Sequence, residues 1–151
     1  MKDLHTLPEL EILICEWAEQ KGLLNRDFAP KQRMKLLEEV GETAGAILKN
    51  NTPEIIDGIG DIFVVLVILF KQENRQLYMQ QEVDNVSNDM FYIFQAIIDF
   101  SSKPQMNGFV IAWLDFVAKR NGMDLTECAN SAYNVIKNRT GKLVGGSFIK
   151  D

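Results

Sequence analysis

Residues 52–73 read TPEIIDGIGDIFVVLVILFKQE, and they predict the central element of the fold. The stretch opens with Thr52 as a helix N-cap, Pro53 at the first helical position and an acidic residue in the first turn. The apolar run from Ile62 to Phe70 alone could pass for a buried strand, but its continuity with that cap favours a helix. Because the helix is apolar on all sides, we expect it at the centre of the molecule.

Further helices are expected on both sides of this central one. Start and stop residues predict five of them, over about residues 6–21, 30–49, 76–101, 107–120 and 124–139. The tail that follows, up to Lys150, is expected to be extended. The sequence therefore predicts an all-α helical bundle of about five to six helices. It forms a single domain over residues 1–151, with a short extended C-terminal tail.

Composition limits the classes of function. With 151 residues the chain is long enough to bury a core without a disulfide or a metal. Its two cysteines, Cys15 and Cys128, show no metal-ligand spacing, which fits a reducing compartment. The single histidine, His5, gives poor support to mechanisms that need a histidine base or several histidine ligands.

Charge and hydropathy exclude two kinds of partner. The formal net charge of −5 is opposite in sign to that of a typical nucleic-acid binder, so we expect no nucleic acid. The start, MKDLHTLPEL, lacks the features of a secretory signal. The apolar run of nine residues is well short of the ~20 that a membrane-spanning helix needs. We therefore expect a cytoplasmic protein with no membrane partner.

Two acidic clusters are candidate sites of chemistry. The first is Glu38-Glu39-Val40-Gly41-Glu42, on the helix before the central one. Its carboxylates are expected to face away from a core stripe made of Leu37, Val40, Ala44, Ile47 and Leu48. Gly41 and Gly45 would let another backbone approach closely. The alternative is a solvated face on which Lys35 pairs with Glu38 or Glu39.

The second cluster lies on the central helix itself. Asp57 and Asp61 are one turn apart, and Asp61 leads directly into the apolar run. A carboxylate in a buried position needs a cation or hydrogen-bond partners. Gly58 and Gly60 lie between the two aspartates at a cost of ~1 kcal/mol each inside a helix, which indicates close packing or room for a ligand. The alternative is an aspartate that caps a neighbouring helix or pairs with a lysine.

Together the clusters predict a metal–phosphate site. Antiparallel helices joined by the short link 50–52 would face each other and bring the carboxylates together. Carboxylates without histidine suit Mg²⁺ or Mn²⁺, and a carboxylate free of metal could act as a base on water. Polar and basic residues near the last helix end would bind phosphate, unless they only complement the helix dipole: Asn134, Lys137, Arg139 and Lys142.

Aromatic side chains could stack on a base, although aromatic residues at helical spacing are more often part of the core. The candidates are Trp17, Tyr92, Trp113 and Tyr133.

These motifs resemble the MazG-like all-α nucleoside triphosphate pyrophosphohydrolases, in particular the compact single-domain forms of phages and bacteria. The likeness rests on Lys35-Leu-Leu-Glu-Glu-Val-Gly-Glu42, on Ile56-Asp-Gly-Ile-Gly-Asp61 and on the closing segment 125–150. Residues 74–111 look like a helical insertion relative to the shortest members. Its apolar part, residues 90–100, should bury against the core or, as we favour, against a second subunit.

The resemblance implies Mg²⁺-dependent hydrolysis of a nucleoside triphosphate, deoxy- or non-canonical, between its α- and β-phosphates. The products would be a nucleoside monophosphate and pyrophosphate. It also implies a homodimer or homotetramer, in the cytoplasm of a bacterium or of a phage-infected cell. By the family pattern Glu39, Glu42 and Asp61 would hold the metal with help from Asp57. Glu38 and Glu39 are the candidates to orient or deprotonate water, and Lys35 joins the phosphate-binding set.

One position departs from the family pattern. Gly58 stands where the second acidic motif is expected to carry a glutamate, and Asp57 instead resembles a DxIGD variant of some compact members. This change leaves an alternative open. The chain could be a catalytically weak or inactive helical oligomer that binds a nucleotide or a partner protein.

Overall fold

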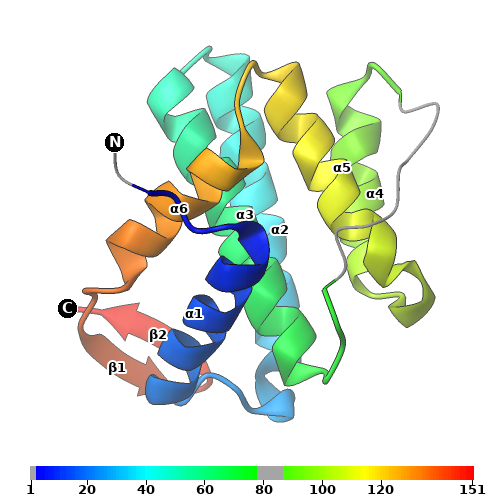
Figure 1. The fold of residues 1–151 in the computed structure, drawn as a ribbon. Helices are drawn as coiled ribbons and strands as arrows, with labels where there is room; N and C mark the ends of the chain where they lie inside the picture. Colours follow the sequence, from blue (N-terminus) through cyan, green and yellow to red (C-terminus); the bar gives the residue numbers. More distant parts are fainter. Residues whose placement is uncertain (1–2, 78–86) are drawn as a thin grey trace.

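The computed structural model describes residues 3–77 and 87–151, and helix α3 (Thr52–Gln72) forms its centre (Figure 1). Every residue from Ile62 to Phe70 is at most 7% exposed, so the predicted central helix is confirmed. Its N-cap is Asn51 rather than Thr52, because the Asn51 side chain accepts a hydrogen bond from the Glu54 backbone N–H at 3.3 Å. The N-cap therefore lies one residue earlier than predicted, and Thr52 is the first residue of the helix.

Five more α-helices lie around α3 in the described part of the chain. They are α1 (Leu7–Gln20), α2 (Ala29–Leu48), α4 (Met90–Ser101), α5 (Asn107–Arg120) and α6 (Leu125–Ile136). Short 3₁₀ turns, Arg26–Phe28 and Pro104–Met106, lead into α2 and α5. The all-α fold is as predicted, and α6 ends three residues before the expected Arg139.

The predicted helix 76–101 is confirmed from Met90 to Ser101, whereas the described residues 76, 77 and 87–89 are not helical. Residues 78–86 lie outside the described residues, and α4 starts at Met90, where the Asp89 side chain caps the Phe91 N–H at 3.0 Å. After α3 the chain turns at Asn74, which has a positive φ of 51°. Arg75 then bonds to Asn107 Oδ1, to Glu73 and to the Ser101 carbonyl, and it stacks on Phe70. This side chain fastens the turn to α4 and α5.

The tail forms a β-hairpin, which the sequence analysis did not predict. Strands β1 (Gly141–Val144) and β2 (Ser147–Lys150) pair antiparallel, with Val144 opposite Ser147. Gly145 and Gly146 both have positive φ, 55° and 84°, as the tight turns of two-residue hairpins require. The Gly-Gly pair was the signal for this turn. The hairpin lies beside α1 (Figure 1), where Phe148 meets Trp17.

The buried face of α2 differs from the predicted stripe. Leu37 is 50% and Leu48 85% exposed, whereas Glu39 and Thr43 are buried at 6% and 0%. The buried set is Ala29, Leu36, Glu39, Val40, Thr43 and Ala46. Apolar periodicity misplaced the face because two of its members are polar. The buried Thr43 hydroxyl has a hydrogen-bond partner within its own helix, because it donates to the Glu39 carbonyl at 2.7 Å.

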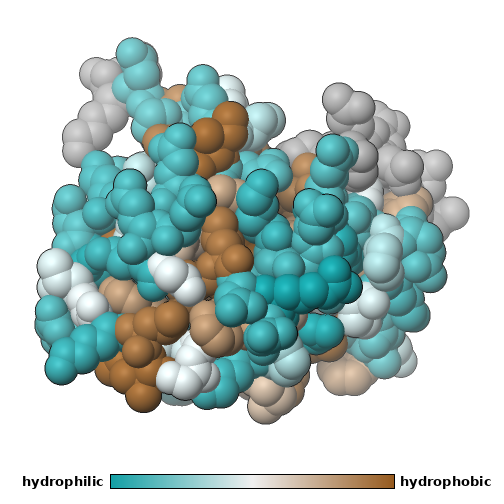
Figure 2. Space-filling model, turned by 90° about the horizontal axis from the view of Figure 1, so that it is seen from below, coloured by the Kyte–Doolittle hydropathy of each residue, from teal (hydrophilic) through white to brown (hydrophobic). Residues whose placement is uncertain are grey.

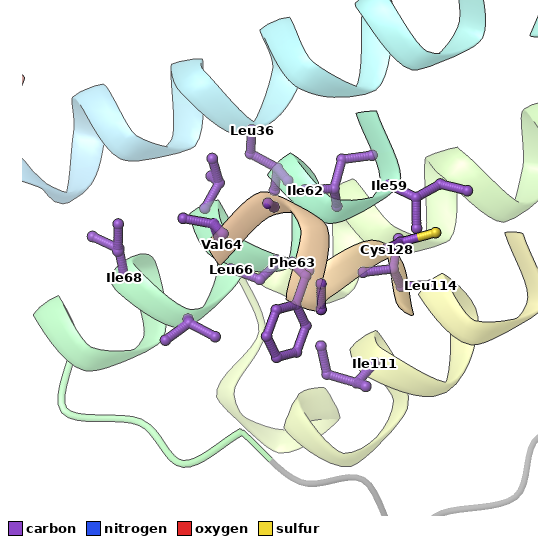
Figure 3. Close-up of a cluster of buried hydrophobic side chains, with 14 of the residues drawn as sticks. Leu36, Ile59, Ile62, Phe63, Val64, Leu66, Ile68, Ile111, Leu114 and Cys128 are labelled. Atoms are coloured by element: carbon purple, nitrogen blue, oxygen red, sulfur yellow. The ribbon is translucent and has the colours of Figure 1, made fainter. Parts of the chain in front are cut away.

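The core lies where α3 meets its neighbours. Figure 3 shows Ile59, Ile62 and Phe63 of α3 among side chains from α2, α5 and α6. On α4, Ile93, Phe94 and Ile97 are buried within the chain, so this part of the insertion packs on its own core rather than on a second subunit. The surface is mainly hydrophilic in the view of Figure 2, with local apolar areas. No helix in residues 3–77 and 87–151 is long and apolar enough to cross a membrane.

Candidate functional site

A cleft of ≈ 680 Å³ opens between α2, α3, the residues after α6 and the hairpin. Small-molecule sites typically measure ~300–1,000 Å³, so the cleft is large enough for a nucleotide. Six predicted site residues line it together: Lys35, Glu38, Glu39, Glu42, Asp61 and Arg139. Antiparallel packing of α2 on α3 brings the two acidic motifs to one place, as the short link 50–52 predicts.

An ion pair occupies the α2 side of the cleft. The Lys35 ammonium lies 3.2 Å from Glu38 Oε1 and 3.0 Å from Glu39 Oε1. Burial lowers the pKa of Lys35, but the hydrogen bonds and charges of Glu39 and Glu38 outweigh this, and the pKa ends above its ordinary value. The predicted alternative, in which Lys35 pairs with these glutamates, is therefore realised. Lys35 and Glu38 are exposed side chains in the lining of the cleft, and Glu39 is buried.

Asp61 is the carboxylate of the cleft whose pKa its surroundings shift most strongly. Burial, and after it the charge of Glu39, raises the pKa of Asp61 from 3.8 to about 6, although Arg139 and Lys35 act in the opposite direction. No hydrogen bond or salt bridge from the described residues holds this side chain. A half-buried carboxylate next to other carboxylates is stabilised by a cation.

The glycines of α3 serve close packing. A Cβ atom added at Gly58 would lie 2.2 Å from Thr43 Oγ1 of α2, and one at Gly60 would lie 2.4 Å from the Cys128 carbonyl oxygen of α6. A glutamate at position 58 would therefore collide with α2. The expected backbone approach at Gly41 and Gly45 is absent within the described chain, since nothing lies within 4 Å of a Cβ there.

Four predicted residues lie outside the lining of the cleft. Asp57 is exposed and acts on the site only by its charge, which raises the pKa of Asp61. Lys137 donates to Asn134 Oδ1 at 2.9 Å on the exposed side of α6, and Lys142 is exposed on β1. Of the four aromatic candidates, only Trp17 lines the cleft.

Several lining residues were missed by sequence reasoning. Gln32 lies one turn before Lys35 on the same helix face, which was a usable signal. Ser147, Phe148 and Lys150 come from the hairpin, and only its Gly-Gly turn could have indicated them. These side chains reach the cleft because the hairpin packs against α1.

The residues of the cleft fit a hard divalent cation in chemistry and charge. Four carboxylates line it, with no histidine or cysteine in the lining, and burial followed by the charge of Glu39 raises the pKa of Asp61. In the described parts of the chain, no group of three or more such side chains is already close enough to hold a metal ion. Lys35 supplies positive charge between two of the carboxylates instead.

Comparison with known proteins supports the family resemblance. Among curated proteins, an uncharacterized 18.2 kDa protein in the rep-hol intergenic region of Haemophilus phage HP1 (strain HP1c1) is 46% identical over 61 residues. That alignment covers 40% of this chain and 37% of the phage protein, so the chain matches well under two thirds of its relative. No solved structure matches the chain. Residues 31–90, which hold both acidic motifs, match the MazG nucleotide pyrophosphohydrolase domain, so the MazG-like resemblance is confirmed over this segment.

Proposed function

We propose that this chain is a cytoplasmic Mg²⁺-dependent nucleoside triphosphate pyrophosphohydrolase. It cleaves between the α- and β-phosphates of a deoxy- or non-canonical nucleotide and releases a nucleoside monophosphate and pyrophosphate. The observation that carries the proposal is one cleft in which Glu38, Glu39, Glu42 and Asp61 meet Arg139. Both acidic motifs belong to the segment that matches the MazG domain.

Each side chain of the cleft has a proposed role. Glu39, Glu42 and Asp61 hold Mg²⁺, with Mn²⁺ as a possible substitute and Asp57 as a supporting charge. The bound ion supplies positive charge for the phosphates and increases the acidity of water. Glu38 is more exposed than Glu39 and is the better placed of the two to accept a proton from the attacking water.

The basic residues complete the proposed phosphate site. Lys35 exchanges a glutamate partner for a phosphate oxygen, and Arg139 faces the phosphates from the other side of the cleft. Lys137, Lys142 and Asn134 lie outside the lining and serve phosphates that extend beyond the cleft.

A product assay tests the reaction. We expect the protein with Mg²⁺ to convert at least one member of a panel of canonical and modified nucleoside triphosphates to monophosphate and pyrophosphate, resolved by ion-exchange chromatography. EDTA and Glu42→Gln should each stop the reaction, because both remove part of the cation site. An intact panel in the presence of folded protein would contradict hydrolysis.

A non-catalytic nucleotide-binding oligomer is the second candidate. It is favoured by the Lys35 ion pair and by the absence of a preassembled metal group among the described residues. Under this alternative, isothermal titration calorimetry gives tight binding of nucleotide with Mg²⁺, and the nucleotide remains intact for hours.

The proposed working form is a homodimer or homotetramer built on the outer face of α2. Met34, Leu37 and Leu48 are 65%, 50% and 85% exposed there, and Gly41 between them has open space around it. A second copy on this face would border Glu38 and Glu42. Analytical ultracentrifugation should show more than one copy, and Leu37→Glu should shift the protein toward monomer. A monomeric wild type at assay concentrations would contradict this.

A further inference from the structure

The cleft has a second end that phosphate chemistry does not use. On α3, Val65 and Ile68 lie one and two turns beyond Asp61, and on the antiparallel α2, Gln32 lies about two turns before Glu39. The Gln32 amide donates to the Val65 carbonyl at 3.3 Å, which joins the two helices at this end. The cleft thus changes along its length from carboxylates to a lining that is mainly apolar, with Lys31 and Lys150 as its charged members.

Two aromatic rings stand at the apolar end. Trp17 of α1 and Phe148 of β2 meet edge to face, with ring centroids 5.5 Å apart and planes at 75°. Leu23 and Val64 add to the same lining. A ligand that fills both ends therefore needs a charged part and a flat, largely apolar part.

Trp17 carries a hydrogen-bond donor that no described residue accepts. The residue is 8% exposed, and its indole Nε1–H is buried without a hydrogen bond to residues 3–77 or 87–151. Buried donors are almost always paired in native proteins, and Trp17 is the one residue of the cleft lining that has a buried polar side-chain atom without a partner among the described residues. The Gln32 side-chain N–H donates to the Val65 carbonyl, so the Gln32 amide oxygen is left as an acceptor in the same lining.

We propose that this apolar end is a nucleobase subsite, in which the base packs on the Trp17–Phe148 pair and accepts a hydrogen bond from Trp17 Nε1–H. A nucleobase is flat and carries acceptor and donor atoms on its edge, which matches the free indole N–H and the Gln32 oxygen. Sugar and phosphate groups lack that apolar face. The subsite rests on the proposed nucleotide hydrolysis for the ligand at the acidic end, and it makes Trp17 a specificity-determining residue.

Trp113 provides a matched control. Its Nε1–H is also buried without a partner in the described part of the chain, but the residue lies on α5 between Phe100 and Phe116 and is not part of the cleft. Phenylalanine at either position removes an unpaired indole N–H and keeps an aromatic ring. A purely structural role for both tryptophans predicts similar behaviour of the two variants.

Fluorescence tests the contact without any need for catalysis. The chain has two tryptophans, so Trp113→Phe leaves Trp17 as the sole indole and Trp17→Phe leaves Trp113. We expect deoxynucleoside monophosphates to quench the emission of Trp113→Phe far more than that of Trp17→Phe. Deoxyribose 5-phosphate and pyrophosphate, which lack a base, should quench neither. Equal quenching in the two variants, or none, would overturn the subsite.

Kinetics gives the second readout. Loss of one neutral hydrogen bond should raise KM for the preferred nucleoside triphosphate about 3- to 10-fold in Trp17→Phe, with a smaller change in kcat. Inhibition by inorganic tripolyphosphate should be the same as in wild type, and Trp113→Phe should retain wild-type KM. A matching loss of tripolyphosphate affinity in Trp17→Phe would contradict a base-specific role.

The two readouts separate the subsite from the function. Quenching of Trp17 by bases without any turnover would retain the subsite and reject hydrolysis. Turnover with an unchanged KM in Trp17→Phe and no quenching would retain hydrolysis and reject the subsite.

Discussion

Asp61→Asn should abolish Mg²⁺-dependent turnover and at the same time stabilise the metal-free protein at pH 8. Turnover should fall by roughly 10²-fold or more, because the variant loses one of the charges that face the proposed cation. The stability gain follows from the raised pKa of Asp61, about 6 against an ordinary 3.8. If the Asp61 carboxylate stabilised the fold, Asp61→Asn would instead lower the free energy of unfolding at pH 8.

The pH dependence of this gain has a definite direction. The folded protein holds a proton on Asp61 up to about pH 6, while the unfolded chain loses it near 3.8, so ionisation of Asp61 destabilises the fold. The penalty is complete above about pH 6 and disappears as the pH falls toward 4. A two-unit shift corresponds to ~3 kcal/mol at most, and partial exposure reduces this to about 1–2 kcal/mol. At this chain length, that amounts to about 2–8 °C in Tm.

Thermal melts in EDTA between pH 4.5 and 8 measure the effect. The Tm difference between Asp61→Asn and wild type should be largest at pH 8 and should close toward pH 4.5. Asp57→Asn is the matched control, since Asp57 is exposed and ranks behind Glu39 among the charges that raise the pKa of Asp61. Its gain should be smaller. A lower Tm for Asp61→Asn at pH 8 would contradict the electrostatic account of the site.

The acidic half of the site could be predicted because local rules determine it. Glu39 and Glu42 are neighbours by helix periodicity. The short link 50–52 forces α2 and α3 into antiparallel contact, which places Asp61 in the same cleft as these glutamates. The same periodicity placed the buried face of α2 wrongly. It cannot foresee that a buried hydroxyl, Thr43, bonds to its own helix and packs on Gly58.

The aromatic half of the site could not be predicted in the same way. Trp17 and Phe148 are far apart in sequence, and they meet only because the hairpin seats on α1. Gly146 lets the hairpin turn lie against Phe28, where an added Cβ atom would be 2.6 Å from the ring. Such contacts depend on tertiary packing, for which propensity and periodicity give no signal.

Gly60→Ala should be strongly destabilising, although alanine is the better helix former. The added methyl group would lie 2.4 Å from the Cys128 carbonyl oxygen and 2.8 Å from Ala132 Cβ, so α6 must move away from α3. Overpacking of this kind costs ~1–3 kcal/mol and occasionally more, and a backbone oxygen cannot rotate aside as a side chain can. The higher helix propensity of alanine stabilises the fold by at most ~1 kcal/mol. We expect a net loss of about 2 kcal/mol, or ~4–8 °C in Tm.

The same displacement should reach the site. Arg139 lies three residues after the end of α6, and its charge lowers the pKa of Asp61 across the cleft, so an outward shift of α6 separates the two groups. Turnover of Gly60→Ala should therefore fall even at temperatures where circular dichroism shows the variant folded. Gly41→Ala is the control, made in the Leu37→Glu background that removes the proposed contact with a second copy. A Cβ atom at Gly41 meets nothing within 4 Å among the described residues, so this change should gain up to ~1 kcal/mol. A wild-type Tm for Gly60→Ala would show that α6 does not need this close approach, and a loss at Gly41→Ala in the Leu37→Glu background would contradict the open space at Gly41.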